Sequence, residues 1–326
     1  MNTLELKKIA EQLAIDVDNY CDRKWGDEER SHLGASLIGD ECQRKLWYGF
    51  RWCGGDKPEP RVKRLFDRGH KEEERFIDYL TGIGCKVQPF DMKWRLLNIP
   101  NTDEYTVVEI DSLTPDMLAV DVSEDPKHIK RANELGIDYP IQWRVSGVQG
   151  HFGGSLDGKG YLPEHYPIKE EILFEFKTHN KASFAKLKKE GMKLSKPQHY
   201  AQCCVYGYKM KLNYVCYVAV NKDDDDLHFE IVELNHNTGA MLEIKAEKII
   251  VSQEPPPRLN ENPNMFLCKM CSYRHICHAE GKPEQNCRSC KHAKPANDKK
   301  WVCTKFNQEL TEEIIVGKYQ CWECIC

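Results

Sequence analysis

Apolar positions along this 326-residue chain follow helical spacing in some segments and strand spacing in others. Helical spacing predicts helices at residues 1–25, 61–84, 181–193, 197–210 and 238–252. Extended apolar runs predict strands within residues 145–178, around a glycine-rich turn, and at 213–222 and 227–234. Residues 85–145 mix short strand-like pieces with one helix near 126–136, so we interpret them as an insertion. The pattern predicts an α/β fold: a mixed central sheet flanked by helices, followed by a cysteine-rich, metal-binding C-terminal region.

The composition is that of an ordinary water-soluble globular chain. Hydrophobic residues make up 40% and charged residues 30%, which provides enough apolar material for a large core. The formal net charge of −4 gives no global sign of a nucleic-acid binder, so any basic surface must be local. No segment has the pattern of a signal peptide or of a membrane span, so we expect a cytoplasmic protein that does not contact membranes.

One predicted strand, in the stretch EILFEFKT, carries charges inside an apolar run. Side chains two apart on a strand share a face, so Glu175 and Lys177 project together while the neighbouring phenylalanines point into the core. Asp157 ends the preceding strand and comes beside Glu175 if the two strands pair. Adjacent carboxylates repel unless a proton or a cation separates them, and hard divalent ions prefer oxygen ligands. The pattern indicates a metal site acting on a phosphodiester, although an exposed Glu–Lys pair explains these residues equally well on their own.

Two helices contribute further candidate residues. In FDRGHKEEERF, His70 shares a helix face with Glu73 and Glu74, and histidine can join carboxylates around a Mn²⁺-like ion. In KPQHYAQCCVYGY, Gln202 and Tyr206 lie four apart on one face, where they could support a metal ligand or contact a phosphate. An ordinary solvated or partly buried helix face is the alternative for each segment taken alone.

The segment that links this strand to the second of these helices is strongly basic. Its six lysines accompany one acid, Glu190, which suits contact with a phosphate backbone beside a metal site. These candidate nucleic-acid-binding residues are Lys181, Lys186, Lys188, Lys189, Lys193 and Lys196. A solvated charged helix face explains the run equally well. The acidic stretch DDDD, residues 223–226, is interpreted as a solvated hairpin tip.

These segments together resemble the PD-(D/E)XK nuclease superfamily, and within it the RecB-like branch. The resemblance rests on a G-H-x-x-E helix, an Asp at a strand end, an E-x-K strand and a Q-x-x-x-Y helix, in that order. It implies a restriction-endonuclease-like core and phosphodiester hydrolysis that depends on Mg²⁺ or Mn²⁺. The implied metal ligands are His70, Glu73, Asp157, Glu175 and the carbonyl of Phe176. The implied catalytic residues are Lys177, Glu175, Asp157, Gln202 and Tyr206. Glu74 is a rival to Glu73, because the stretch HKEEE leaves the register of the acid open.

The resemblance also implies a function. We expect a DNA exonuclease that acts on single-stranded or end-containing DNA, similar to nucleases of phage or mobile-element recombination, with a single-strand annealing or binding protein as partner. No Walker motif is present, so we expect neither a helicase motor nor a nucleotide cofactor. An RNA substrate is not distinguished from DNA by these residues. The alternative from another class is a non-catalytic nucleic-acid-binding or scaffold protein that uses the basic segment and the C-terminal region.

Cysteine is abundant, with 16 residues of which ten are Cys42 and the nine of the C-terminal region. C-x-x-C pairs in a reducing cytosol favour metal binding over disulfides. Cys42, Cys268, Cys271 and Cys277 resemble the cysteines of the iron–sulfur RecB-like nucleases, which include the CRISPR-associated adaptation nuclease and the AddB-type helicase–nuclease subunit. The resemblance implies a 4Fe–4S cluster that joins the two ends of the nuclease core. The alternative is Zn²⁺ held by the three later cysteines and His278, with Cys42 simply buried.

The last segment contains a second C-x-x-C pair. Cys287 and Cys290, followed by Cys303 and Cys321, fit a zinc ribbon, with Cys324 and Cys326 as competing ligands. The same segment carries a tryptophan, Trp301, and several lysines, which suits a grip on single strands, protein docking or a purely structural role. These lysines include Lys291, Lys294, Lys299, Lys300 and Lys305. The remaining cysteines are expected to pack in the core: Cys21, Cys53, Cys85, Cys203, Cys204 and Cys216.

The motifs and a proline- and asparagine-rich linker divide the chain into three parts. We expect a nuclease core at residues 1–253, with the insertion around 85–145. A linker and cluster-binding segment follows at 254–281 and is completed by Cys42. The zinc ribbon occupies residues 282–326.

Overall fold

The computed structural model describes residues 2–26, 29–99, 102, 104–112, 119–120, 126–137 and 139–325. Its helices are α1 (Thr3–Trp25), α2 (Gln43–Phe50), α3 (Pro60–Gly82), η1 (Ile110–Ser112), α4 (Pro126–Glu134), η2 (Val148–Gly150), α5 (Lys181–Ser195), α6 (Pro197–Met210), α7 (His236–Val251), α8 (Phe266–Lys269), α9 (Arg274–Cys277) and α10 (Glu312–Val316). Its strands are β1 (Leu33–Gly34), β2 (Lys86–Gln88), β3 (Trp94–Asn98), β4 (Tyr105–Glu109), β5 (Ala119–Val120), β6 (Arg144–Gly147), β7 (Phe152–Ser155), β8 (Gly158–Tyr161), β9 (Ile172–His179), β10 (Tyr214–Asn221), β11 (Leu227–Glu233), β12 (Ala293–Pro295), β13 (Trp301–Cys303) and β14 (Gln308–Leu310). The helices and strands predicted from apolar spacing are confirmed.

The central sheet has five strands in the order β11-β10-β9-β8-β2. Strand β10 runs parallel to β9, whereas the other neighbours pair antiparallel, so the sheet is mixed as predicted. In the pairing of β8 with β9, Gly158 lies opposite Phe174. Continued by one residue, this register places Asp157 opposite Glu175, as the sequence pattern required.

Alternation along β9 separates two hydrophobic cores. Phe174 and Phe176 pack with Phe76 and Leu80 of α3 on one face of the sheet. Leu173 faces the other way, into the larger core that α5 and α6 help to form. The mixed α/β fold with helices on both faces of the sheet is therefore the fold that the sequence predicted.

Two smaller sheets lie beside the central one. In the first, β1-β7-β6, strand β1 pairs parallel to β7 and β6 pairs antiparallel to it. The second, β4-β3-β5, belongs to a separate hydrophobic cluster around Leu96, Ala132 and Tyr139. Parts of residues 85–145 lie outside the described residues, and the interpretation of this segment as an insertion stays a prediction.

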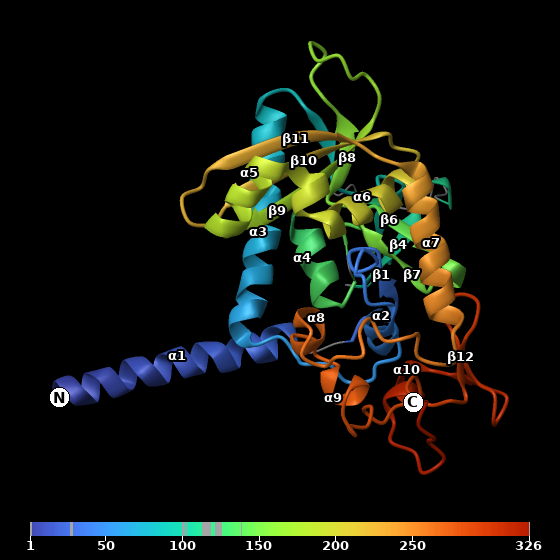
Figure 1. Ribbon diagram of the computed structural model, residues 1–326. Helices are drawn as coiled ribbons and strands as arrows, with labels where there is room; N and C mark the ends of the chain where they lie inside the picture. Colours follow the sequence, from blue (N-terminus) through green and yellow to red (C-terminus); the bar gives the residue numbers. More distant parts are fainter. Residues whose placement is uncertain are drawn as a thin grey trace.

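The C-terminal region packs closely against α2 and the β6–β7 connection (Figure 1). Trp301 is only 2% exposed and packs against the rings of Phe50 and His151, with centroid distances of 5.2 and 5.6 Å. Arg51, itself fully buried, donates to the Ala293 carbonyl at 2.8 Å. The expectation that Trp301 could stack on a single strand is therefore wrong, because its ring is part of the core.

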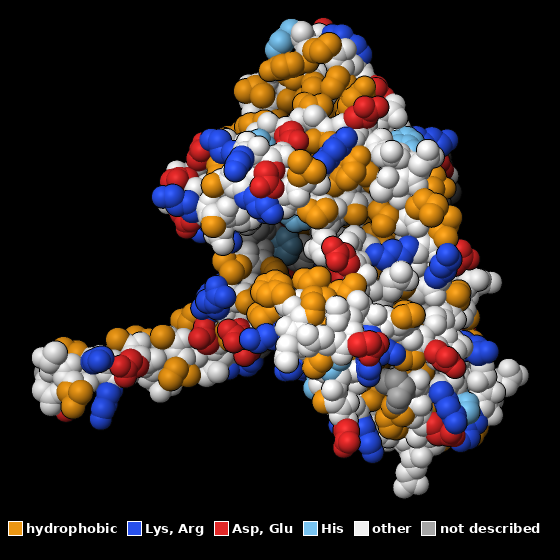
Figure 2. Space-filling model, viewed as in Figure 1, with side chains coloured by type: hydrophobic (Ala, Val, Ile, Leu, Met, Phe, Trp, Pro, Cys, Tyr) orange, Lys and Arg blue, Asp and Glu red, His pale blue; other side chains and the backbone are white. Residues whose placement is uncertain are grey.

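Helix α1 projects from the body of the molecule and carries the N-terminus at its far end (Figure 1). Cys21 is its only buried residue among those described, and apolar side chains along the rest of the helix are exposed (Figure 2). Its C-terminal end is held by ion pairs to α3, including Lys63 with Asp22 at 3.1 Å. Among the described helices, none combines the length and the apolar composition needed to cross a bilayer.

Candidate active site

Three predicted residues, Asp157, Glu175 and Lys177, meet where β8 begins beside β9. The Lys177 ammonium forms an ion pair with Glu175 and lies 3.5 Å from Oδ2 of Asp157. It also donates to the Phe176 carbonyl at 2.9 Å. The Phe176 N–H in turn donates to Oδ2 of Asp157 at 2.8 Å, which ties the start of β8 to β9. The spacing of charges in β9 therefore does bring the two carboxylates and the lysine together.

Burial makes this group electrostatically unusual. Glu175 is completely buried, and neither of its carboxylate oxygens has a hydrogen-bond partner, although one is ion-paired with Lys177. Burial raises the pKa of Glu175. The charge of Lys177 lowers this pKa, whereas the charge of Asp157 raises it. Burial lowers the pKa of Lys177, but Asp157 and Glu175 more than offset it and hold that pKa well above its usual value. The lysine therefore stays charged and is the counter-ion of the two acids.

Helix α3 adds Glu73 and His70 to the same region. Burial, and after it the neighbouring charge of Asp157, raise the pKa of Glu73 to about 8. Both Glu73 and His70 line the cavity into which Asp157 projects, while Glu74 is exposed and does not line it. Of the two acids that HKEEE left open, Glu73 is therefore the one that faces the carboxylates, while its role as a metal ligand stays a prediction.

Helix α6 supplies the remaining predicted pair. The Gln202 side chain donates to the Tyr206 hydroxyl at 3.2 Å, and both side chains are buried but reach the cavity wall. A Cβ atom at Gly154 would lie 2.6 Å from the Tyr206 hydroxyl, so the bare backbone of β7 is what lets this hydroxyl approach. The four motif segments are therefore brought together at one place.

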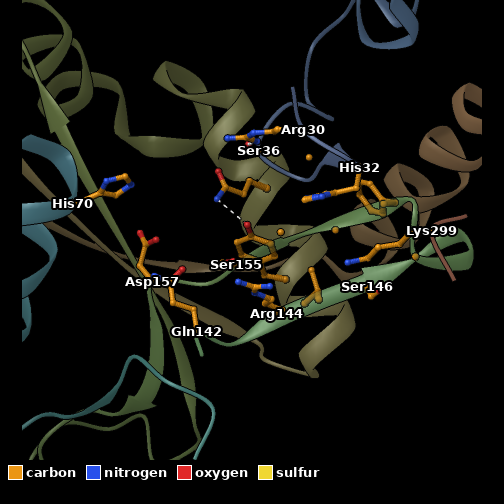
Figure 3. Close-up of a pocket in the computed structure, with 18 of the residues that line it drawn as sticks. Arg30, His32, Ser36, His70, Gln142, Arg144, Ser146, Ser155, Asp157 and Lys299 are labelled. Carbon is orange, nitrogen blue, oxygen red and sulfur yellow. Dashed lines mark hydrogen bonds between the residues drawn. The ribbon is translucent and has the colours of Figure 1, made fainter. Parts of the chain in front are cut away.

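A cleft of about 490 Å³ opens over these residues (Figure 3). His70 and Asp157 lie at one end of it, and His32 and Lys299 lie at the other, with Arg30 and Arg144 between them. Glu175 and Lys177 lie behind Asp157 and do not themselves line the cavity. Sequence reasoning noted Lys299 among the C-terminal lysines but missed Arg30 and Arg144 and did not place any of the three in one cleft, because they lie on segments far apart in the chain and form no local motif.

The predicted basic segment of α5 does not line the cleft. Lys188 pairs with Asp226 at 2.8 Å and Lys186 with Glu190 at 3.7 Å. The backbone N–H of Lys181 donates to Asp223 at 2.7 Å. The stretch DDDD is thus a hairpin turn. Its residues Asp223 and Asp226 also contact lysines of α5, so the turn does not face solvent alone. A nucleic-acid-binding role for Lys181, Lys186, Lys188, Lys189, Lys193 and Lys196 stays a prediction.

Three of the predicted oxygen ligands of a metal ion contact the same positive charge. Carboxylate oxygens of Asp157 and Glu175 and the Phe176 carbonyl all contact the Lys177 ammonium. Hard divalent ions prefer such a set of oxygens, so these residues fit Mg²⁺ or Mn²⁺. In the described part of the chain, no group of three or more His, Cys, Asp or Glu side chains is arranged to hold a metal ion as it stands. The ammonium makes contacts that were predicted for a divalent ion, and the metal site stays a prediction.

The cysteines predicted to bind an iron–sulfur cluster lie around one small cavity. Cys42, Cys268, Cys271 and Cys277 all line this space of about 60 Å³, and His278 lines it too. Burial raises the pKa of both Cys268 and Cys271, and Cys42 and Cys277 add to the effect through their charge. The structure thus brings Cys42 to the C-terminal cysteines, whereas the bound group, iron–sulfur or zinc, stays a prediction.

The predicted zinc-ribbon cysteines lie around a second small cavity. Cys287, Cys290, Cys303 and Cys321 line it, and burial, then the charges of the other three, raise the pKa of Cys287 to about 11. The strand β13 carries Cys303, while Cys324 forms an isolated bridge with Cys290. Cys326 lies outside the described residues. The zinc assignment also stays a prediction.

No protein-family model matches this chain, and no curated protein sequence matches it. Among solved structures, an alkaline exonuclease from Laribacter hongkongensis is similar with 13% identity, a TM-score of 0.36, and coverage of 70% of this chain and 90% of its own. The same exonuclease in complex with dAMP gives 12% identity, a TM-score of 0.34 and the same coverage. SSO0001 gives 14% identity and a TM-score of 0.37, with 83% of this chain and 96% of that chain covered. Likeness at this level assigns neither an activity nor a substrate.

Proposed function

We propose that this chain is a metal-dependent nuclease. The observation that carries the proposal is the convergence of Asp157, Glu175 and the Phe176 carbonyl on the Lys177 ammonium. A structural ion pair does not need a second carboxylate, a shared carbonyl and an adjoining open cleft. Carboxylates with raised pKa values beside a charged lysine in a cleft are typical of functional sites.

Each residue has a distinct proposed role. Asp157, Glu175 and the Phe176 carbonyl would hold Mg²⁺ or Mn²⁺, with His70 and Glu73 at the edge. Such an ion, when bound, supplies Lewis-acid chemistry to a phosphodiester. Lys177 then stabilises the negative charge that develops on the phosphate. Gln202 and Tyr206 orient a phosphate oxygen from the cleft wall, since both can donate hydrogen bonds.

The substrate is proposed to be DNA, single-stranded or with free ends, cleaved as an exonuclease does. Basic side chains beside the carboxylates suit contacts to phosphates, which carry no sequence information. The resemblance of the motifs supports a setting in phage or mobile-element recombination in the cytoplasm, with a single-strand annealing or binding protein as partner. RNA is the competing substrate, and the same assay distinguishes the two.

The two cysteine sets are proposed to hold metals of different kinds. A 4Fe–4S cluster at Cys42, Cys268, Cys271 and Cys277 would join the segment before α2 to the segment after the linker, because thiolates from both converge there. Zn²⁺ is proposed for the C-terminal set. Protein purified without oxygen should then contain iron, absorb visible light and contain zinc as well. Colourless, iron-free protein with stoichiometric zinc only would contradict the cluster.

The function is tested with end-labelled single-stranded DNA, duplex DNA and RNA, each incubated with Mg²⁺, Mn²⁺ or EDTA. We expect metal-dependent cleavage by the wild type and a loss of roughly 10²–10³ in rate for Lys177→Ala, as for removal of one charge-stabilising donor. The size ladder of the products separates exonuclease from endonuclease action.

The matched control is Lys159→Ala. Lys159 lies on the adjacent strand β8 and pairs with Glu171 at 3.1 Å, outside the cleft lining. It should retain wild-type cleavage. Equal activity of the Lys177 variant would contradict the proposed site, and no cleavage by folded, metal-loaded wild type would favour a non-catalytic nucleic-acid-binding protein.

A further inference from the structure

The far half of the cleft gathers basic side chains from three segments of the chain. Lys299 lies at the far end and Arg30 and Arg144 in the middle, whereas Asp157 lies at the other end. Among the described residues that line the cleft, the acids are Asp157 and Glu73. Burial lowers the pKa of His32. The charges of Lys299, Arg30 and Arg144 lower it further, in that order. A cluster of positive charges along a concave site attracts an anion.

One of these charges comes from the C-terminal cysteine-rich region. Lys299 lies in the turn between β12 and β13, where Asp298 and Lys299 both adopt left-handed backbone conformations, with φ of 57° and 61°. The Lys299 N–H donates to the Gln149 carbonyl at 3.0 Å. A Cβ atom at Gly150 would lie 2.7 Å from the Lys299 side chain, so the glycine makes room for it. The turn therefore packs against Gln149 and Gly150, and Gly150 lines the cleft.

The rest of the C-terminal region holds this turn in place. The His151 ring nitrogen contacts the Ala296 carbonyl at 2.8 Å, just before the turn. Trp301 follows directly after it and is buried against Phe50 and His151. Lys299 is therefore carried by a turn that is held on both sides by contacts to the rest of the fold.

We propose that Lys299 binds a backbone phosphate of the nucleic acid, so that the C-terminal cysteine-rich region forms part of the substrate site. The inference rests on the proposed function and deepens it by naming a binding residue. The chemistry is that of a phosphodiester, which offers anionic oxygens to a lysine without base specificity. The α5 lysines, of which at least Lys186 and Lys188 are paired with acids, would contribute less.

The test measures binding rather than cleavage. A labelled single-stranded oligonucleotide is titrated with the full chain in EDTA, over a series of salt concentrations, for the wild type and for Lys299→Asn. Asparagine tolerates the left-handed backbone at this position, so the variant removes the charge without straining the turn. We expect binding to weaken on the order of fivefold, and the salt dependence to fall by about 0.7 in log–log slope, the value for one phosphate contact on a single strand.

Two variants keep the result interpretable. Lys299→Arg preserves the charge and should bind nearly as the wild type does. Lys294→Gln removes an exposed lysine of the same region that does not line the cleft, and it should leave the slope unchanged. Circular dichroism of each variant checks that it is folded.

An unchanged affinity and slope for folded Lys299→Asn would overturn the inference, as would an equal loss in Lys294→Gln. Failure of the proposed nuclease activity has a different signature, namely wild-type binding without metal-dependent cleavage. Loss of cleavage in Lys177→Ala together with normal salt dependence in Lys299→Asn would leave the nuclease standing and remove only Lys299 from its substrate site.

Discussion

The two ends of the cleft are built in opposite ways. At the acidic end, Glu175 is completely buried and Asp157 is locked to β9 by the Phe176 N–H. At the basic end, Arg30 and Lys299 are exposed side chains on segments that meet only through tertiary packing. Buried, over-determined groups suit chemistry that needs fixed geometry, whereas exposed cations suit reversible contact with a flexible polyanion. Substitutions at the two ends should therefore change different quantities.

The largest effect is expected from Asp157→Asn. This change keeps an oxygen for the Phe176 N–H but removes the charge that pairs with Lys177. The cleavage rate should fall by roughly 10²–10³, since a residue of the chemical step is altered. Oligonucleotide affinity in EDTA should stay the same or rise slightly, because a negative charge is lost from the cleft. A large loss of affinity would erase the distinction between the two ends.

The next largest effect should separate two neighbouring acids. Glu73→Gln removes the carboxylate that faces Asp157, and we expect cleavage to fall by about 10–100-fold, as for residues that tune a metal site. Glu74→Gln, one residue on and exposed, should remain within about twofold of the wild type, since surface changes are usually small. The cleavage rate of each variant is measured over a range of metal ion concentrations. The reverse result would mean that Glu74 is the residue at the site.

A smaller effect is expected at the basic end. Arg144→Gln should weaken oligonucleotide binding in EDTA by on the order of fivefold, uniformly across sequences, and reduce its salt dependence. The cleavage rate at saturating substrate should change little, because the side chain is not beside the carboxylates (Figure 3). A fall in this saturated rate with unchanged affinity would place Arg144 in the chemistry instead.

The last effect concerns the free energy of unfolding, through two buried histidines near the acidic end. His179 and His199 both contact the Tyr217 hydroxyl, at 3.0 and 2.8 Å, and burial lowers their pKa values to about 4 and about 3. Between these values and the ordinary 6.5, the unfolded chain binds more protons than the folded one. The free energy of unfolding should therefore fall by up to about 2 kcal/mol for each histidine as the pH drops from 7 to 5.

Urea unfolding in EDTA at several pH values measures this slope. His199→Gln should flatten it, because one of the two buried imidazoles is removed. His165→Gln, at an exposed position, should leave it as in the wild type. An equal slope in all three proteins would mean that these buried histidines do not control the acid sensitivity.

The sequence predicts the acidic end well because its information is local. The alternation of β9 fixes the faces of Glu175 and Lys177, and the register of the β8–β9 pair places Asp157 opposite Glu175. The choice between Glu73 and Glu74 could not be made, since both are compatible with one helix face and only packing of α3 on the sheet distinguishes them.

The basic end could not be predicted, for a physical reason. Arg144 and Lys299 become neighbours of the same cleft only when the turn before β13 packs on the β6–β7 connection. Long-range packing of this kind leaves no periodic trace in the sequence. The same limit explains two other differences: Trp301 is part of the core, and Asp226 neutralises Lys188.

The Lys177 ammonium gives the site its own counter-ion, and this has a consequence for the proposed metal dependence. The chain can fold in a metal-poor environment without leaving two neighbouring carboxylates uncompensated in a buried place. Under the proposed function, metal loading would be an exchange of one cation for another, so its apparent affinity would be lowered by the strength of the ion pair that must open. The proposed nuclease would then be inactive at low divalent ion concentration and would respond when that concentration rises.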